Sequence, residues 1–247
     1  MTCVTTWAPS WLWQGARVAS GEFRLRIRYG KVGRLRWLSH LEVIHSLERA
    51  IRRASLPYAI TQGFSPHMKC AFGPALPVGT AGENEYLDIW LTRYTRADEA
   101  LARLVDAMPA DLAPLEARYV AEEERSLSAA ITIGVYHAAV SGKESSADKV
   151  RTALQRVVDS GSLTVEHKGK QKVYDLARCL PEEARVSDQD GTSGVALTIR
   201  MGPEGSLRPE LFIREALRVA SLDATVSRMT RTDTLIETEE GVWVRPL

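Results

Sequence analysis

The chain alternates apolar and polar residues most strictly over Phe23–Tyr29. Phe23, Leu25, Ile27 and Tyr29 fall on one side, and arginines occupy the positions between them. A repeat of two residues is the pattern of a half-buried β-strand. The segment therefore predicts a strand with one apolar face and one basic face.

A helix is predicted directly after this strand and a short Gly-containing bend. Ser39 and Glu42 have the spacing of a capping box, in which each residue hydrogen-bonds the backbone of the other, and Pro57 ends the helix. On a helical wheel, the predicted apolar face contains Leu41, Ile44, Leu47, Ile51 and Ala54. Trp37, before the helix, and Phe64, in the loop after it, are interpreted as core anchors, with platforms for base stacking as the alternative.

The order strand, helix, strand, strand, helix, strand is predicted twice along the chain. This order is that of a split βαβ unit, so we expect an α+β fold made of two tandem ferredoxin-like units with antiparallel sheets. The expected boundaries are a loosely ordered leader over 1–22, a first domain over 23–121, a linker over 122–128, a second domain over 129–236 and a tail over 237–247. The leader carries several tryptophans, whose role the sequence leaves open.

The charge is distributed unevenly. Residues 1–93 contain 12 Lys and Arg against 6 Asp and Glu, whereas the rest of the chain is acidic, so the net charge of +1 hides a basic first part. Such a part favours an anionic partner, although a solvated charged face would have the same composition.

The remaining composition excludes several classes of protein. Cys3, Cys70 and Cys179 are too far apart for a zinc ribbon or an iron–sulfur site, so neither a metal nor a cofactor is expected. No apolar run approaches the roughly 20 residues of a membrane span. We expect a cytoplasmic protein that has no membrane partner.

The arginines of the first part are the candidate site for an anion or RNA, because guanidinium groups grip phosphates and stack on bases. The candidate residues are Arg24, Arg26, Arg28, Lys31, Arg34, Arg36, Arg49, Arg52 and Arg53. The aromatic pair with which an RNA-binding sheet stacks bases is missing from the arginine face. Two other uses remain open: gripping an acidic protein surface, or pairing with carboxylates of the second domain.

Two histidines are the candidates for catalysis. His40 lies in the capping box and His67 in a Gly/Pro-rich loop, and imidazole titrates near neutral pH. If both approached Glu85 and Asp88, they would suit an acid–base or a metal site. No spacing in the sequence requires that approach, and a purely structural role for His40 fits the sequence as well.

The string RLRWLSHLEVIHSLERAIRRASLPYAITQGFSPHMKCAFGPALPVGTAGENEYLDI resembles the N-terminal part of the radical-SAM-linked protein family, an uncharacterised bacterial family. The likeness covers roughly residues 23–92. The motif residues on which it rests most are Ser39, His40, Gly63, Phe64, Pro66, His67, Glu85, Tyr86 and Asp88. Glu42 stands where the family usually has Asp, and Gly82 where it often has Ser. The resemblance implies a partner, a cobalamin-binding radical SAM protein.

These observations predict a non-catalytic accessory protein of a radical SAM enzyme. Its basic face would bind an anionic substrate, with RNA the first candidate, or the enzyme itself. The chain has no CxxxCxxC run with which to bind the cluster of such an enzyme. The alternative is a metal-independent endoribonuclease-like enzyme with His40 or His67 as general base and Arg52 or Arg53 at the phosphate.

Overall fold

The computed structural model describes residues 21–167, 170–189, 192–202 and 206–247. Of the expected leader, residues 1–20 lie outside these ranges. The first half of the chain folds into β1 (Phe23–Lys31), the 3-10 turn η2 (Gly33–Trp37), α1 (His40–Arg53), β2 (Cys70–Phe72), β3 (Ala81–Leu91), α2 (Ala97–Ala107), the turn η3 (Ala110–Leu112) and β4 (Pro114–Tyr119).

The second half begins inside the expected linker. Its elements are α3 (Leu127–Ala130), β5 (Ile133–Gly142), α4 (Ala147–Asp159), β6 (Ser162–His167), β7 (Lys170–Asp175), α5 (Leu176–Cys179), β8 (Arg185–Gln189), β9 (Thr192–Arg200), α6 (Pro209–Val219), β10 (Ala224–Glu237) and β11 (Trp243–Val244). Strand β8 pairs antiparallel with β9. None of the helices in the described residues is long and apolar enough to span a membrane.

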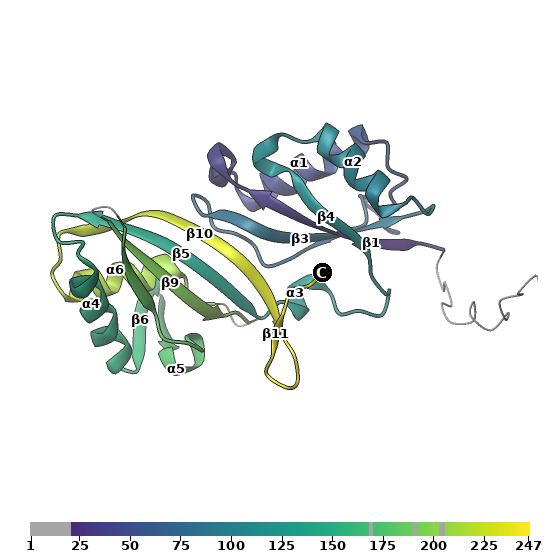
Figure 1. The fold of residues 1–247 in the computed structure, drawn as a ribbon. Helices are drawn as coiled ribbons and strands as arrows, with labels where there is room; N and C mark the ends of the chain where they lie inside the picture. The colour runs from purple at the N-terminus through teal and green to yellow at the C-terminus, as the bar shows by residue number, and fades with distance from the viewer. Residues whose placement is uncertain (1–20, 168–169, 190–191, 203–205) are drawn as a thin grey trace, which may run out of the picture.

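The two halves share a single mixed sheet in the order β4-β1-β3-β10-β5-β9-β8 (Figure 1). Strand β2 pairs with the far end of β3, and β11 pairs with β10. The pairings are antiparallel except one: β10 joins β3 in parallel, through Thr230 opposite Ala81 and Arg231 opposite Gly82. The prediction of an α+β fold with a mostly antiparallel sheet is confirmed. The assignment to two ferredoxin-like units stays a prediction.

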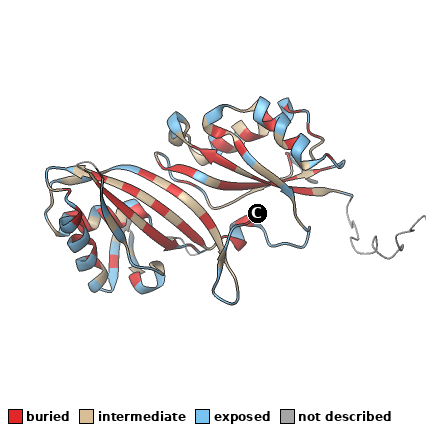
Figure 2. Cartoon of the chain, in the orientation of Figure 1, coloured by how far each residue is buried: buried red, intermediate tan, exposed pale blue. Residues whose placement is uncertain are grey.

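Each half has its own apolar core on the helical face of the sheet (Figure 2). In the first half, α1 and α2 cover β1 and β3, and Leu25, Ile27 and Leu87 are buried beneath them. A smaller cluster around Tyr86 and Leu127 packs at the junction of the halves. The apolar side of β1 therefore lies where its alternation predicted.

Helix α1 begins at the predicted cap and buries Leu47, Ile51 and Ala54 of the predicted face, but not Leu41. The backbone N–H of Ser39 donates to the Glu42 carboxylate (2.7 Å), and both halves of the capping box are formed. Val43, Leu47, Ala50 and Ile51 are buried, whereas Leu41 is 65% exposed. Leu41 precedes Val43 by two residues and so projects about 200° away from it around the helix axis. The prediction that Leu41 belongs to the buried face is wrong.

Candidate functional site

Two arginines on the basic face of β1 form ion pairs with one buried carboxylate. Arg26 lies directly opposite Asp88 of β3, and Arg24 is two residues away on the same face. The Nε atoms of Arg24 and Arg26 donate to Asp88 at 2.9 and 2.8 Å, and Arg24 Nη2 donates to it at 2.6 Å. All three side chains are buried. Because isolated charges are costly to bury, each of these groups depends on the others.

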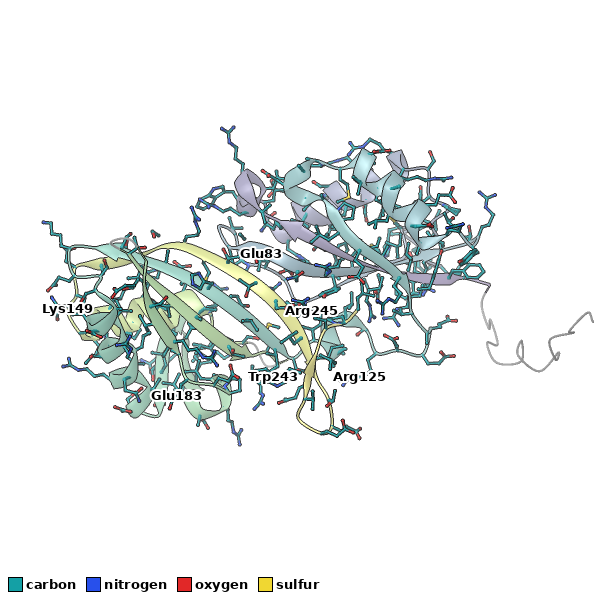
Figure 3. The ribbon with its side chains drawn as sticks, viewed as in Figure 1. Glu83, Arg125, Lys149, Glu183, Trp243 and Arg245 are labelled. Carbon is teal, nitrogen blue, oxygen red and sulfur yellow. The ribbon has the colours of Figure 1, made fainter. Side chains whose placement is uncertain are left out.

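Two segments of the chain cover these arginines. Arg24 donates to the carbonyl oxygens of Glu124 (2.6 Å) and Arg125 (3.1 Å). Arg26 donates to the Glu124 carboxylate (2.9 Å) and to the carbonyl of Pro246 (3.1 Å). Both covering segments can be followed in Figure 3, where Arg125 and Arg245 are labelled. The expectation of an open cationic surface at Arg24 and Arg26 is wrong, because 121–125 and the C-terminal residues fold across it.

Arg28 and Lys31 are also occupied. Arg28 donates to Glu116 of β4 (3.2 Å) and to Asn84 (2.6 Å), and only part of its side chain reaches solvent. Lys31 is buried and its ammonium donates to the Leu38 carbonyl (2.8 Å). Burial lowers the pKa of Lys31. Neither cation is free to receive a phosphate.

A second ionic cluster joins the two halves of the chain. Arg231 of β10 donates through Nη2 to Glu85 of β3 (2.5 Å) and to the Pro74 carbonyl (2.7 Å). Both side chains of this ion pair are buried. Arg231 stands opposite Gly82 where β10 joins β3, so the ion pair lies at the contact between these two strands. Arg231 was not among the predicted site residues; its only sequence signal is a cation within the mixed pattern of the closing strand.

His40 lies beside this cluster. Its ring meets Phe72 edge-on, and it lines a small cavity together with Lys31 and Glu85. Burial and the positive charges of Lys31 and Arg231 lower the pKa of His40, so its imidazole is neutral at pH 7. The cavity has a free volume of about 10 Å³, the space of about one water molecule. A substrate would have to bind outside it.

His67 occupies a different environment. Its Nδ1 contacts the Thr61 hydroxyl (3.1 Å) and the Ser65 carbonyl (3.0 Å), and its side chain is exposed. His67 does not line the cavity of His40. The structure thus places the predicted pair in separate surroundings, and among the described residues it shows no His, Cys, Asp or Glu group able to hold a metal.

Trp37 and the motif residue Phe64 are in solvent. Trp37 is 60% exposed, and Phe64 is fully exposed. Trp37 packs on Gly79, whose φ of +87° and close approach leave no room for a Cβ. The Arg36 guanidinium lies 5.2 Å from the centre of the Trp37 ring. The interpretation of Trp37 and Phe64 as core anchors is wrong, because turns hold both outside the helical layer.

Four predicted arginines remain at the surface. Arg34, Arg49, Arg52 and Arg53 are exposed. Arg52 pairs with Glu48 of the same helix (3.5 Å), and Arg53 caps the end of α2 at the Ala107 carbonyl (2.5 Å). Exposed pairs of this kind contribute little to stability. Their guanidinium groups can still exchange these contacts for those of a partner.

The other motif residues divide between core and loop. Tyr86, Glu85 and Asp88 are buried on β3, whereas Gly63 and Pro66 are exposed beside Phe64. The Tyr86 hydroxyl is buried and makes no hydrogen bond with the described residues. Its burial raises the pKa of Tyr86 to about 12. The buried motif residues build the sheet, and the exposed ones are available to a partner.

Comparison with known proteins gives a family and a distant structural likeness. A family model described as an uncharacterised protein conserved in bacteria (DUF2344) matches residues 24–209. No curated protein matches the chain. Among solved structures, the chain is similar to a Cbf5-Nop10-Gar1 complex (12% identity, TM-score 0.48, 85% of this chain and 48% of that one) and to an archaeal box H/ACA sRNP Nop10-Cbf5 complex (14%, TM-score 0.43, 85% and 47%). The chain spans about half the length of these solved chains.

Proposed function

We propose that this chain, which belongs to the DUF2344 family of uncharacterised proteins conserved in bacteria, is a non-catalytic accessory protein that binds RNA. The binding surface is the solvent-facing side of α1 with the turn before it and the loop after it. We call it the α1 surface and define it by Arg34, Trp37, Leu41, Arg49, Arg52 and Phe64. The radical SAM enzyme implied by the sequence resemblance is the proposed recipient of the bound RNA.

The exposure of Trp37 and Phe64 to solvent carries this proposal. An indole that is 60% exposed and a fully exposed phenyl ring contribute little to the core of this chain. Proteins that bind single-stranded RNA stack bases on such rings and place arginines along the phosphates. The α1 surface has both components: Trp37 and Phe64 for bases, and Arg34, Arg49 and Arg52 for phosphates.

The geometry at His40 supports binding over catalysis. A general base needs a reachable proton and room for the substrate. The cavity at His40 holds about one water molecule, and the Nδ1 atom of His67 is engaged by its own loop. We therefore assign His40 to packing beside Lys31 and His67 to stabilising the loop that presents Phe64.

The test is fluorescence polarisation with a labelled single-stranded RNA over a series of salt concentrations. We expect affinity to fall with salt, and each of Arg49→Ala and Arg52→Ala to reduce the salt slope by about 0.7. Trp37→Ala and Phe64→Ala should weaken binding by about 1–3 kcal/mol per lost stack without changing that slope. The matched control is Arg214→Ala, an exposed arginine of α6 in the other half, which should leave binding unchanged.

Three results would count against the proposal. One is an affinity that does not depend on salt, and another is equal weakening by the control. The third is turnover of the RNA that His40→Ala or His67→Ala abolishes without loss of binding; it would favour the endoribonuclease alternative. A capture experiment tests the enzyme partner separately. If the wild-type and Arg49→Ala chains capture the radical SAM protein equally well, docking of the enzyme does not depend on this arginine, which is proposed to bind RNA.

A further inference from the structure

Strand β4 ends the sheet on the side of the first half (Figure 1). At the opposite end, β8 is partly covered, because Arg151 of α4 donates to the Val186 carbonyl (3.0 Å) and the Ala147 N–H donates to Asp188 (3.3 Å). An uncovered edge strand presents unpaired N–H and C=O groups to any chain that can pair with them. Strand β4 is therefore the edge to consider.

The backbone of β4 shows which groups face outward. The Val120 N–H donates to the Arg24 carbonyl of β1 (3.0 Å), and Arg118 and Glu116 stand opposite Arg26 and Arg28. Hydrogen bonding alternates along an antiparallel pair, so Ala117 and Tyr119 direct their N–H and C=O away from β1. Within the described part of the chain, no hydrogen bond reaches these outward groups.

The residues of this edge are complementary to themselves when reversed. If Ala117 faces its own copy in an antiparallel pair, Glu116 comes opposite Arg118 of the other copy, and Leu115 opposite Tyr119. Leu115 is 48% exposed, and Tyr119 stacks on the exposed ring of Tyr94, with 5.1 Å between the ring centres. Opposite charges and apolar pairs directly across a sheet stabilise it.

We propose that a second copy of this chain adds to the sheet at β4, related by a two-fold axis through the Ala117 pair. The two copies form one continuous sheet, with two Glu116–Arg118 pairs on one face. On the other face, Leu115 of each copy packs against Tyr119 and Tyr94 of the second copy. The charge order Glu-Ala-Arg favours this occupant, because the same sequence read in the opposite direction supplies its complement. The exposed Arg118 then exchanges Glu116 of its own strand for Glu116 of the second copy.

The test is size-exclusion chromatography with light scattering on the full chain over a range of concentrations. We expect a monomer–dimer equilibrium. Arg118→Glu should raise the dimer dissociation constant by at least about tenfold, because both symmetric pairs become Glu–Glu. Glu116→Arg combined with Arg118→Glu should restore the dimer, since the charges are again opposite. The matched control is Arg178→Glu, another highly exposed arginine, whose ion pair is with Asp175 at the start of its own helix.

Ala117→Pro removes the central outward N–H and should give a monomer, whose folding is checked by circular dichroism. Where this variant does not fold, the Arg118→Glu series decides, since the Arg118 side chain is 63% exposed and loss of its surface pair with Glu116 of the same strand should cost little stability. A wild-type chain that stays monomeric at every concentration would overturn the proposal. A dimer that Arg118→Glu and Arg178→Glu weaken equally would also overturn it.

Discussion

Replacing Asp88 with Asn should destabilise the fold far more than breaking any surface ion pair. The substitution keeps the shape of the side chain but removes the charge between Arg24 and Arg26. Asp88 Oδ2 accepts from Arg24 Nη2 (2.6 Å) and Arg26 Nη2 (3.1 Å), and Oδ1 accepts from Arg26 Nε (2.8 Å). The amide nitrogen of Asn can accept none of these. Arg26 keeps the Glu124 carboxylate (2.9 Å), whereas the hydrogen-bond partners that Arg24 keeps among the described residues are carbonyl oxygens.

The expected cost is about 3–5 kcal/mol, the range for removing one partner of a buried ion pair. The control is Glu22→Gln, which breaks the partly exposed pair with Lys69 (2.6 Å) and should cost under about 1 kcal/mol. Urea unfolding with linear extrapolation measures both values. Hydrogen exchange should also speed up over 121–125, because these residues are held by Arg24. If Asp88→Asn costs no more than Glu22→Gln, the assignment of Asp88 as the ionic centre of this face is refuted.

Three further changes test other parts of the structure. Ser39→Ala removes the hydroxyl of the α1 cap and should lower the unfolding free energy by about 1 kcal/mol, measured by urea unfolding. Tyr86→Phe removes a buried hydroxyl that makes no hydrogen bond with any described residue. Since the folded pKa of Tyr86, about 12, exceeds the ordinary value, wild-type stability should fall as pH rises from 10 to 12, and the variant should show less of this fall in alkaline urea titrations. Arg231→Met leaves the Glu85 charge buried and should cost about 3–5 kcal/mol, whereas adding Glu85→Gln should recover part of it; no recovery would argue against direct coupling.

The candidate site was only partly predictable. The motif segments from Ser39 to His67 were identified from the sequence, and the exposed arginines of α1 lie among the predicted residues. The environments of the two histidines were not predictable, because the residues between His40 and His67 in the sequence do not determine how far apart the two rings lie in the fold. Arg231 was missed because its partner Glu85 is 146 positions away, and only the pairing of β10 with β3 brings the two together.

The sequence by itself determined the local structure of the first half. The alternation over Phe23–Tyr29 put the arginines of β1 on the face away from the helices, and the Ser39–Glu42 spacing began α1 at the observed residue. A two-residue repeat decides which side chains share a face, because it follows from the strand backbone alone. It does not decide what covers that face. Only the tertiary structure brought residues 121–125 and Pro246 over Arg24 and Arg26, and left Trp37 and Phe64 in solvent, since both outcomes depend on contacts between segments far apart in the chain.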